Sequence, residues 1–225
     1  MPLDEEIVKK ISSAIQEKRF ADAIAIIKPL LEKNPTNVSL LLDIGFAYAN
    51  SAQYKDAITA YEKVIHQTPN NPSGYTGLGF VYRRQEDNEN AVVQFRKALE
   101  HSPDNALVHF ELGEALFDLD RYDEALKSYY EAIKWGGAEN ENTSLHRIAQ
   151  VHLGMDNPDK AIEVASNLLN RDAGFISAYN IIGTASYLKE NWKDAITAFE
   201  KYITKVPDDE AAQNLLFKAK ENLKE

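Results

Sequence analysis

The sequence contains no cysteine among its 225 residues. Disulfide bridges, a lipid-anchored cysteine and thiolate metal sites are therefore excluded. Long apolar runs are missing as well. The first residues, MPLDEEIVKKISSAIQ, form a charged amphipathic pattern without the apolar stretch of a secretory signal. We therefore expect no membrane segment and a cytoplasmic location.

Excess positive charge is also lacking. The chain has 25 Lys and Arg residues against 35 Asp and Glu residues, which gives a formal net charge of −10. Phosphate backbones and anionic membrane surfaces both need a cationic patch on the protein that binds them. Nucleic acids and membranes are therefore disfavoured as partners.

Patterns that carry catalysis are missing too. Neither the glycine-rich nucleotide loops nor the GxSxG nucleophile motif occurs in the sequence. The five histidines fall on different expected helices, or at spacings that do not place two of them on one helical face with a carboxylate. We therefore predict no metal site, no cofactor and no enzymatic activity.

The chain is rich in internal similarity. The segment GFAYANSAQYKDAITAYEKVIHQTP at 45–69 returns, one step of 34 residues later, as GFVYRRQEDNENAVVQFRKALEHSP at 79–103. A period of this length is typical of stacked helical pairs, in which each pair contacts only its neighbours. Such a stack offers a surface for holding other molecules.

Small residues recur within the copies. Gly45, Gly79 and Gly183 lie on expected first helices, and each is followed twelve residues later by an Ala on the expected second helix. A helical Gly costs about 1 kcal/mol relative to Ala, so its recurrence needs a reason. We predict that Gly and Ala allow the paired helices to approach closely. Aromatic residues recur at fixed offsets on the second helices and are predicted to form the core: Tyr61, Phe95, Tyr129 and Phe199.

The ends of the copies share one chemistry. Proline stops helical propagation, and an Asn or Asp two residues later is suited to cap the next helix. The prolines are Pro35, Pro69, Pro103 and Pro207. The predicted caps are Asn37, Asn71, Asn105 and Asp209.

These features together resemble the tetratricopeptide repeat family, whose helix–turn–helix unit carries Gly, Tyr, Ala, an aromatic residue, Ala and Pro in this order. The resemblance implies an all-α fold, a right-handed α-solenoid of antiparallel helix pairs that forms a single domain over residues 1–225. The copies fall at 4–37 (degenerate), 38–71, 72–105, 106–139, 142–175 and 176–209, followed by a capping helix over 208–225. Two extra residues lie between the fourth and fifth copies. There, Gly136 and Gly137 form either a hinge or a tolerated loop insertion.

The resemblance also implies that the first helices line a concave groove. Phe46 and Phe80 directly follow the small Gly, where the family usually has a polar residue. We expect the two rings to stack along the groove and to anchor a protein or peptide partner, because solvated Phe side chains are costly. The predicted partner-binding residues are Leu42, Phe46, Phe80, Arg83, Arg84, Phe110, Glu114, Phe117, His146, Arg147 and Gln150.

Two alternatives stay open at this point. Phe46 and Phe80 can instead pack into the seam between repeats as ordinary core. For the whole protein, an adaptor that binds a peptide or helix segment competes with a self-assembling scaffold that forms homo-oligomers through its terminal repeats. Exposed apolar residues in the groove favour the adaptor. Exposed apolar residues on the terminal faces, such as Val8 and Phe217, favour the scaffold.

Overall fold

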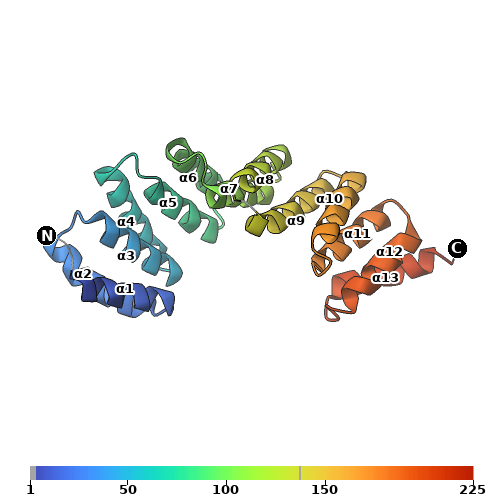
Figure 1. Cartoon of the computed structure of the whole chain (residues 1–225), viewed down its shortest axis with the longest axis horizontal. Coiled ribbons are helices and arrows are strands. Elements are labelled where there is room, and N and C mark those ends of the chain that lie inside the picture. The colour runs from blue at the N-terminus through green and yellow to red at the C-terminus, as the bar shows by residue number, and fades with distance from the viewer. Residues whose placement is uncertain (1–3, 137, 225) are drawn as a thin grey trace. The chain divides into compact units, whose positions relative to one another are not determined.

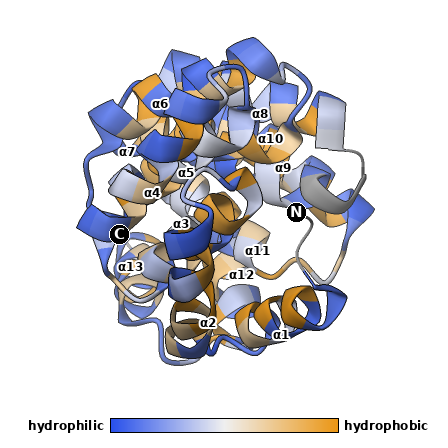
Figure 2. Cartoon of the chain, turned by 90° about the vertical axis from the view of Figure 1, so that its left-hand side faces the viewer, coloured by the Kyte–Doolittle hydropathy of each residue, from blue (hydrophilic) through white to orange (hydrophobic). Residues whose placement is uncertain are grey.

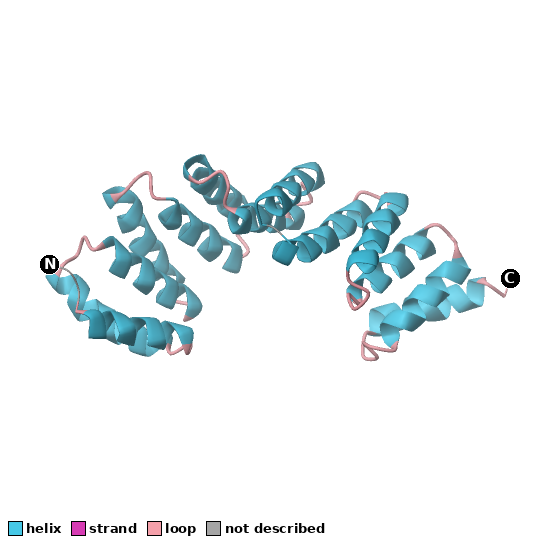
Figure 3. Cartoon of the chain, viewed as in Figure 1, coloured by secondary structure: helices cyan, strands magenta, loops and turns pink. Residues whose placement is uncertain are grey.

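The computed structural model describes residues 4–136 and 138–224, with the backbone alone for residues 138–140. This described part is helical and contains no strand (Figure 3), which confirms the predicted all-α fold. Gly137, one half of the predicted hinge, lies outside the described residues. The helices are α1 (Glu5–Gln16), α2 (Phe20–Lys33), α3 (Val38–Asn50), α4 (Tyr54–Gln67), α5 (Pro72–Arg84), α6 (Asn88–His101), α7 (Ala106–Asp118), α8 (Tyr122–Gly136), α9 (Ala138–Gly154), α10 (Pro158–Arg171), α11 (Ser177–Leu188), α12 (Trp192–Ile203) and α13 (Glu210–Asn222).

The helices gather into two compact units, one ending at Ala115 and the other beginning at Leu116. Successive helices pack against each other from α1 to α6 in the first unit and from α8 to α13 in the second (Figure 1). The first helices of neighbouring repeats also touch, since α3 packs on α5 and α9 packs on α11. Each unit is therefore an α-solenoid of helical pairs. The single domain expected from the repeats stays a prediction.

The helix starts follow the predicted capping chemistry. In each case a side-chain oxygen accepts a hydrogen bond from a backbone N–H in the first turn, which satisfies one of the unpaired donors there. The bonds are Asn37 to Leu40 at 3.1 Å, Asn71 to Ser73 at 3.0 Å, Asn105 to Val108 at 3.2 Å and Asp209 to Ala212 at 2.9 Å. The predicted caps are therefore confirmed.

The tight turns inside the helical pairs share one backbone geometry. Ala52 N–H donates to the Ala49 carbonyl at 3.3 Å and Gln53 N–H donates to the Tyr48 carbonyl at 2.9 Å, the two bonds of a Schellman motif. The residue at the left-handed position of such turns has φ between 53° and 60°, and it is Lys18, Ala52, Glu86, Asp120, Asp156 or Glu190. These turns thus hold a left-handed residue without the help of glycine.

The helical glycines make room for aromatic rings. A Cβ atom built on Gly45 would come within 2.9 Å of the Tyr61 ring, and one on Gly77 would overlap the same ring more closely. One on Gly183 would lie 2.7 Å from the Phe199 ring. At Gly45 and Gly183 the atoms nearest to such a Cβ belong to an aromatic ring of the paired helix, and the predicted close approach of the paired helices through Gly and Ala stays a prediction. The predicted core aromatics are confirmed, since Tyr61 is 5% exposed and Phe199 is 0% exposed.

The amphipathic pattern of the sequence persists in the structure, where polar and apolar residues share the same helices (Figure 2). The helix predicted as a cap, α13, packs on α11 and α12 and buries Ala212 and Ala219. No helix in the described ranges combines the length and the apolar character needed to cross a bilayer.

Candidate functional site

A cavity of about 570 Å³ opens on the first unit. Its walls come from α1, α3, α4 and α5 and from the residue that caps α7. Most of the lining residues come from α3 and α5, the first helices of neighbouring repeats, which pack against each other. The lining residues are Ile15, Leu42, Asp43, Phe46, Ala49, Asn50, Tyr61, Pro72, Ser73, Thr76, Gly77, Phe80, Arg84 and Asn105.

Four of the predicted partner-binding residues meet in this cavity. They are Leu42, Phe46, Phe80 and Arg84. Phe46 is 45% exposed, whereas Leu42 and Phe80 are half-buried. A large apolar side chain left nearly half in solvent beside a cavity is a feature of surfaces that bind a partner.

The two phenylalanine rings do not stack on each other. Phe46 packs edge-on against Phe20, with ring centroids 6.0 Å apart. Phe80 packs edge-on against Phe95, with ring centroids 5.6 Å apart. The expected stacking of Phe46 on Phe80 is therefore wrong, because each ring instead packs against an aromatic ring on the second helix of a repeat. The seam alternative describes Phe80 in part, since one edge of its ring meets the core and the residue still lines the cavity.

Two opposite charges and a phenol line the cavity. Arg84 donates to the Ala49 carbonyl at 2.9 Å and to Asn50 Oδ1 at 3.0 Å, and so ties α5 to the end of α3. Burial raises the pKa of the Asp43 carboxyl above its usual range. The pKa of the Tyr61 hydroxyl is also raised, mainly by burial, while Arg84 lowers it and Asp43 raises it. Asp43 and Arg84 thus each lie near the Tyr61 hydroxyl.

Arg83 forms an ion pair outside this cavity and is not one of its lining residues. Its guanidinium pairs with the Glu111 carboxylate and lies 4.0 Å from an oxygen of Glu114. Glu114 is 8% exposed. The ion pairs connect α5 to α7 within the first unit. Phe110, half-buried on the same helix, is likewise absent from the lining.

The remaining predicted residues belong to the second unit. Phe117 packs against Tyr122, with ring centroids 5.8 Å apart, and His146 packs against Phe175 at 5.4 Å. Arg147 donates to Gln150 Oε1 at 2.9 Å. Burial lowers the pKa of His146 to about 4, and nearby Arg147 adds to this effect. His146 therefore stays neutral at physiological pH.

Several cavity residues were missed in the sequence. The repeat pattern predicts a core position for Tyr61 and a helix cap for Asn105, and it places Asn50 at the end of a helix. Each of them does play that part, and each also contributes to the wall of the cavity. Asn50 carries the only available signal, since it falls four residues after Phe46 on the same helical face.

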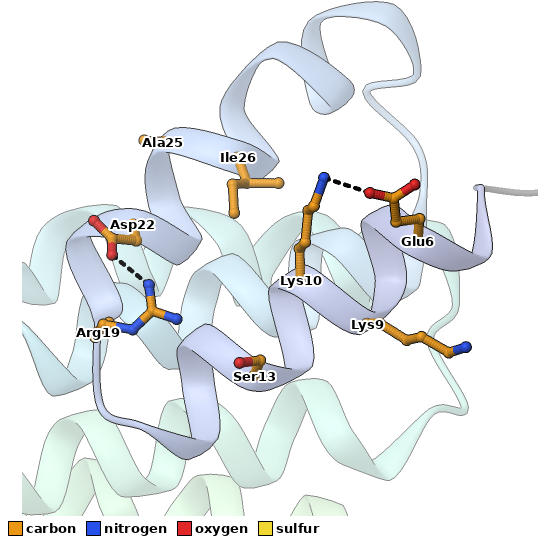
Figure 4. A pocket seen from close by; sticks show the side chains of 8 residues that line it. All are labelled: Glu6, Lys9, Lys10, Ser13, Arg19, Asp22, Ala25 and Ile26. Atoms are coloured by element: carbon orange, nitrogen blue, oxygen red, sulfur yellow. Dashed lines mark hydrogen bonds and ion pairs between the residues drawn. The ribbon is translucent and has the colours of Figure 1, made fainter.

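A second hollow, of about 660 Å³, lies between α1 and α2 (Figure 4). Four of its charged side chains form two ion pairs, with Lys10 and Glu6 at 2.8 Å and Arg19 and Asp22 at 2.6 Å. In Figure 4 the Lys9 side chain extends away from these pairs. Exposed pairs of this kind contribute little binding energy. Across the part of the chain that the structure describes, no cluster of three or more His, Asp or Glu side chains is arranged to hold a metal ion.

Comparison with known families agrees with the repeat geometry. Tetratricopeptide repeat models match residues 14–78, 76–140 and 146–210. The chain belongs to the tetratricopeptide repeat family. Proteins of this family are generally non-catalytic interaction scaffolds. No curated protein matches the sequence.

Solved tetratricopeptide structures share the fold. YrrB, described as a tetratricopeptide protein with an unusual peptide-binding site, is 22% identical, with a TM-score of 0.72 over 87% of this chain and 97% of that one. The C-terminal part of a repeat protein from Cytophaga hutchinsonii is 15% identical, with a TM-score of 0.76 over 94% of this chain and 84% of that one. A MamA structure (MSR-1) is 27% identical, with a TM-score of 0.61 over 73% of this chain and 95% of that one.

Proposed function

We propose that this tetratricopeptide protein is a non-enzymatic adaptor that binds a segment of another protein in the cavity between α3 and α5. The observation that carries the proposal is the 45% exposure of Phe46 at the edge of a cavity of about 570 Å³. Covering the exposed part of one such ring stabilises a complex by roughly 1–2 kcal/mol. The description of YrrB as a peptide-binding tetratricopeptide protein supports a peptide as the ligand class.

The chemistry of the walls favours a protein segment with both apolar and polar groups. Leu42, Phe46 and Phe80 offer apolar surface, while Ser73 and Thr76 offer side-chain hydroxyl groups. A few apolar anchors combined with a few polar groups are typical of sites that fix the register of a bound segment. We place the binding event in the cytoplasm as a part of the same proposal.

The rest of the predicted groove stays a prediction. The other residues predicted to contact a partner are Arg83, Phe110 and Glu114 in the first unit, and Phe117, His146, Arg147 and Gln150 in the second unit. Arg83 and Glu114 would have to exchange their present ion pair for contacts with the partner.

The proposal is tested by affinity capture from cell extract with the wild-type protein, a Phe46→Asn, Phe80→Asn double variant and a Val93→Asn control. Val93 lies on α6, is also 45% exposed and does not line the cavity. We expect a protein that is retained by the wild type and by the control and is lost by the double variant. Circular dichroism must first show equal helicity in all three. A partner that the double variant still retains would contradict the proposal.

A second candidate function, self-assembly through the terminal repeats, has an observation of its own. Phe217 on α13 is 63% exposed, and Val8 on α1 is 43% exposed. Sedimentation of the wild type and of a Phe217→Ser variant separates the two functions. A concentration-dependent oligomer that dissociates in the variant would favour the scaffold. A wild-type protein that stays monomeric at all concentrations would contradict self-assembly and leave the adaptor as the proposed function.

A further inference from the structure

Asp43 is a half-buried charge without a counter-charge. Its carboxylate lines the cavity, and it makes no hydrogen bond or ion pair with any residue in the described ranges. Burial alone shifts its pKa upward, and no neighbouring cation lowers it. A partly desolvated carboxylate that is left unpaired costs free energy, and a ligand that supplies the missing cation recovers that cost.

The positive charge in the same cavity is solvated and held in place by hydrogen bonds. Arg84 donates hydrogen bonds to the Ala49 carbonyl and to Asn50 Oδ1, and the residue is exposed to solvent. Asn105, another polar group of the wall, accepts the backbone N–H of Val108 as a helix cap. The cavity therefore presents a half-buried carboxylate without a partner, together with a guanidinium that is exposed to solvent and hydrogen-bonded to two neutral oxygens.

A second group points to the same ligand chemistry. Tyr61 is 5% exposed and lines the cavity, and its hydroxyl makes no hydrogen bond within the part of the chain that the structure describes. A phenolic oxygen can accept a hydrogen bond from an ammonium or guanidinium group. Phe46 and Phe80 add aromatic rings, whose negative faces attract cations. The unpaired groups and the rings together suit a positively charged group.

We propose that the cavity receives the basic side chain of a lysine or arginine in the partner segment, with its cationic head paired to Asp43 and its aliphatic stem against Phe46 and Phe80. This inference rests on the proposed function, since it names the residue that a bound protein segment must supply. Other occupants fit less well. A purely apolar side chain would cover Asp43 without pairing it, and an acidic side chain would be repelled by it.

The test is selection of random linear peptides displayed on phage, carried out in parallel on the full-length wild type, on Asp43→Asn and on Asp56→Asn. Asp56 is an exposed residue of α4 outside this cavity, so its variant changes the net charge by the same amount. We expect peptides selected by the wild type and by Asp56→Asn to share a Lys or Arg at one position. Peptides selected by Asp43→Asn should lack this preference.

A double-mutant cycle on one selected peptide measures the pairing directly. Replacing its basic residue by Gln is expected to weaken binding to the wild type about tenfold or more, and to have little effect on binding to Asp43→Asn. Equal losses on both proteins would overturn the pairing with Asp43.

The remaining outcomes separate the two proposals. Selected peptides that depend on Phe46 but show no basic preference would overturn the basic-side-chain inference and leave the peptide-binding function intact. An acidic preference that depends on Arg84 would overturn it as well. Failure to select any peptide whose binding depends on Phe46 would overturn both.

Discussion

The left-handed residue in the turns is the most regular backbone feature at the scale of single residues. Lys18, Ala52 and Glu86 hold φ near 58°, 57° and 60° in three successive turns of the first unit. For residues other than Gly, Asn and Asp this left-handed conformation costs about 1 kcal/mol or more, because the Cβ atom crowds the following carbonyl oxygen. The turn recurs because its two backbone hydrogen bonds and the packing of both helices outweigh that cost.

This geometry predicts stabilising substitutions. Ala52→Gly and Glu86→Gly are each expected to raise the free energy of unfolding by roughly 0.5–1 kcal/mol, because glycine adopts the left-handed region without strain. Urea denaturation followed by circular dichroism measures the change. The control is Glu62→Gly, at an exposed position within α4, which should destabilise by about 1 kcal/mol. Destabilisation by Ala52→Gly of the same size would show that the turn carries no strain.

His146 makes a residue-scale prediction about pH. Its pKa is about 4 in the folded protein, against an ordinary value near 6.5. Between these values the unfolded chain binds a proton that the folded chain does not, so stability is present above about pH 6.5 and is lost as the pH falls toward 4. The loss is on the order of 2 kcal/mol once solvent screening of this partly exposed ring is allowed for.

The measurement is urea denaturation at pH 7 and at pH 4.5, for the wild type and for His146→Gln. Both tryptophans, Trp135 and Trp192, lie in the second unit with His146, so their fluorescence reports the relevant transition. The variant should lose less stability than the wild type over this interval. Equal losses would show that His146 is not responsible for the acid sensitivity.

At the scale of helices, the contact between glycine and an aromatic ring sets how closely neighbouring repeats pack. Tyr61 lies on α4 and meets Gly45 on α3 and Gly77 on α5, so one ring fills the space among three helices. Tight packing of this kind leaves little room for an added methyl group. At Gly45 and Gly77 an added Cβ atom would therefore press on the Tyr61 ring.

Gly77→Ala is expected to destabilise the first unit by about 1–3 kcal/mol, because the added methyl would overlap the Tyr61 ring. The same change in a Tyr61→Leu background should cost less, since the ring is gone. Circular dichroism of the four proteins in urea gives the coupling between the two positions. Additive effects would mean that Gly77 is needed for a reason other than this ring.

At the scale of the whole chain, contacts are made between successive helices, and the helices gather into two compact units. Stability in such a chain is a sum of local terms, and cooperativity between distant repeats is limited. A destabilising change in one unit should therefore leave the other unit largely unaffected.

Gly77→Ala provides the test. Its unfolding by circular dichroism should begin at lower urea than that of the wild type, because circular dichroism reports both units. Tryptophan fluorescence, which reports the second unit alone, should keep its midpoint. A matching shift of both transitions would show that the chain unfolds as one cooperative body.

Much of the helical architecture follows from the sequence read alone. The period of 34 residues, the prolines and the Asn or Asp caps give the helix boundaries, because each depends on interactions within a few residues of the chain. Asn71 and Asp209, for instance, cap the helices that they were expected to cap. The candidate site was predictable in part, since Leu42, Phe46, Phe80 and Arg84 were named from their place in the repeat and line one cavity.

The environment of each side chain depended on packing between helices. The sequence could not show that Phe46 meets Phe20 while Phe80 meets Phe95, or that Arg83 pairs with Glu111. Nor could it show that Tyr61 joins Asp43 in the wall of the cavity. The repeat period places a residue on a helical face, but which neighbour it touches is set by the separation and rotation of helices that are distant in sequence.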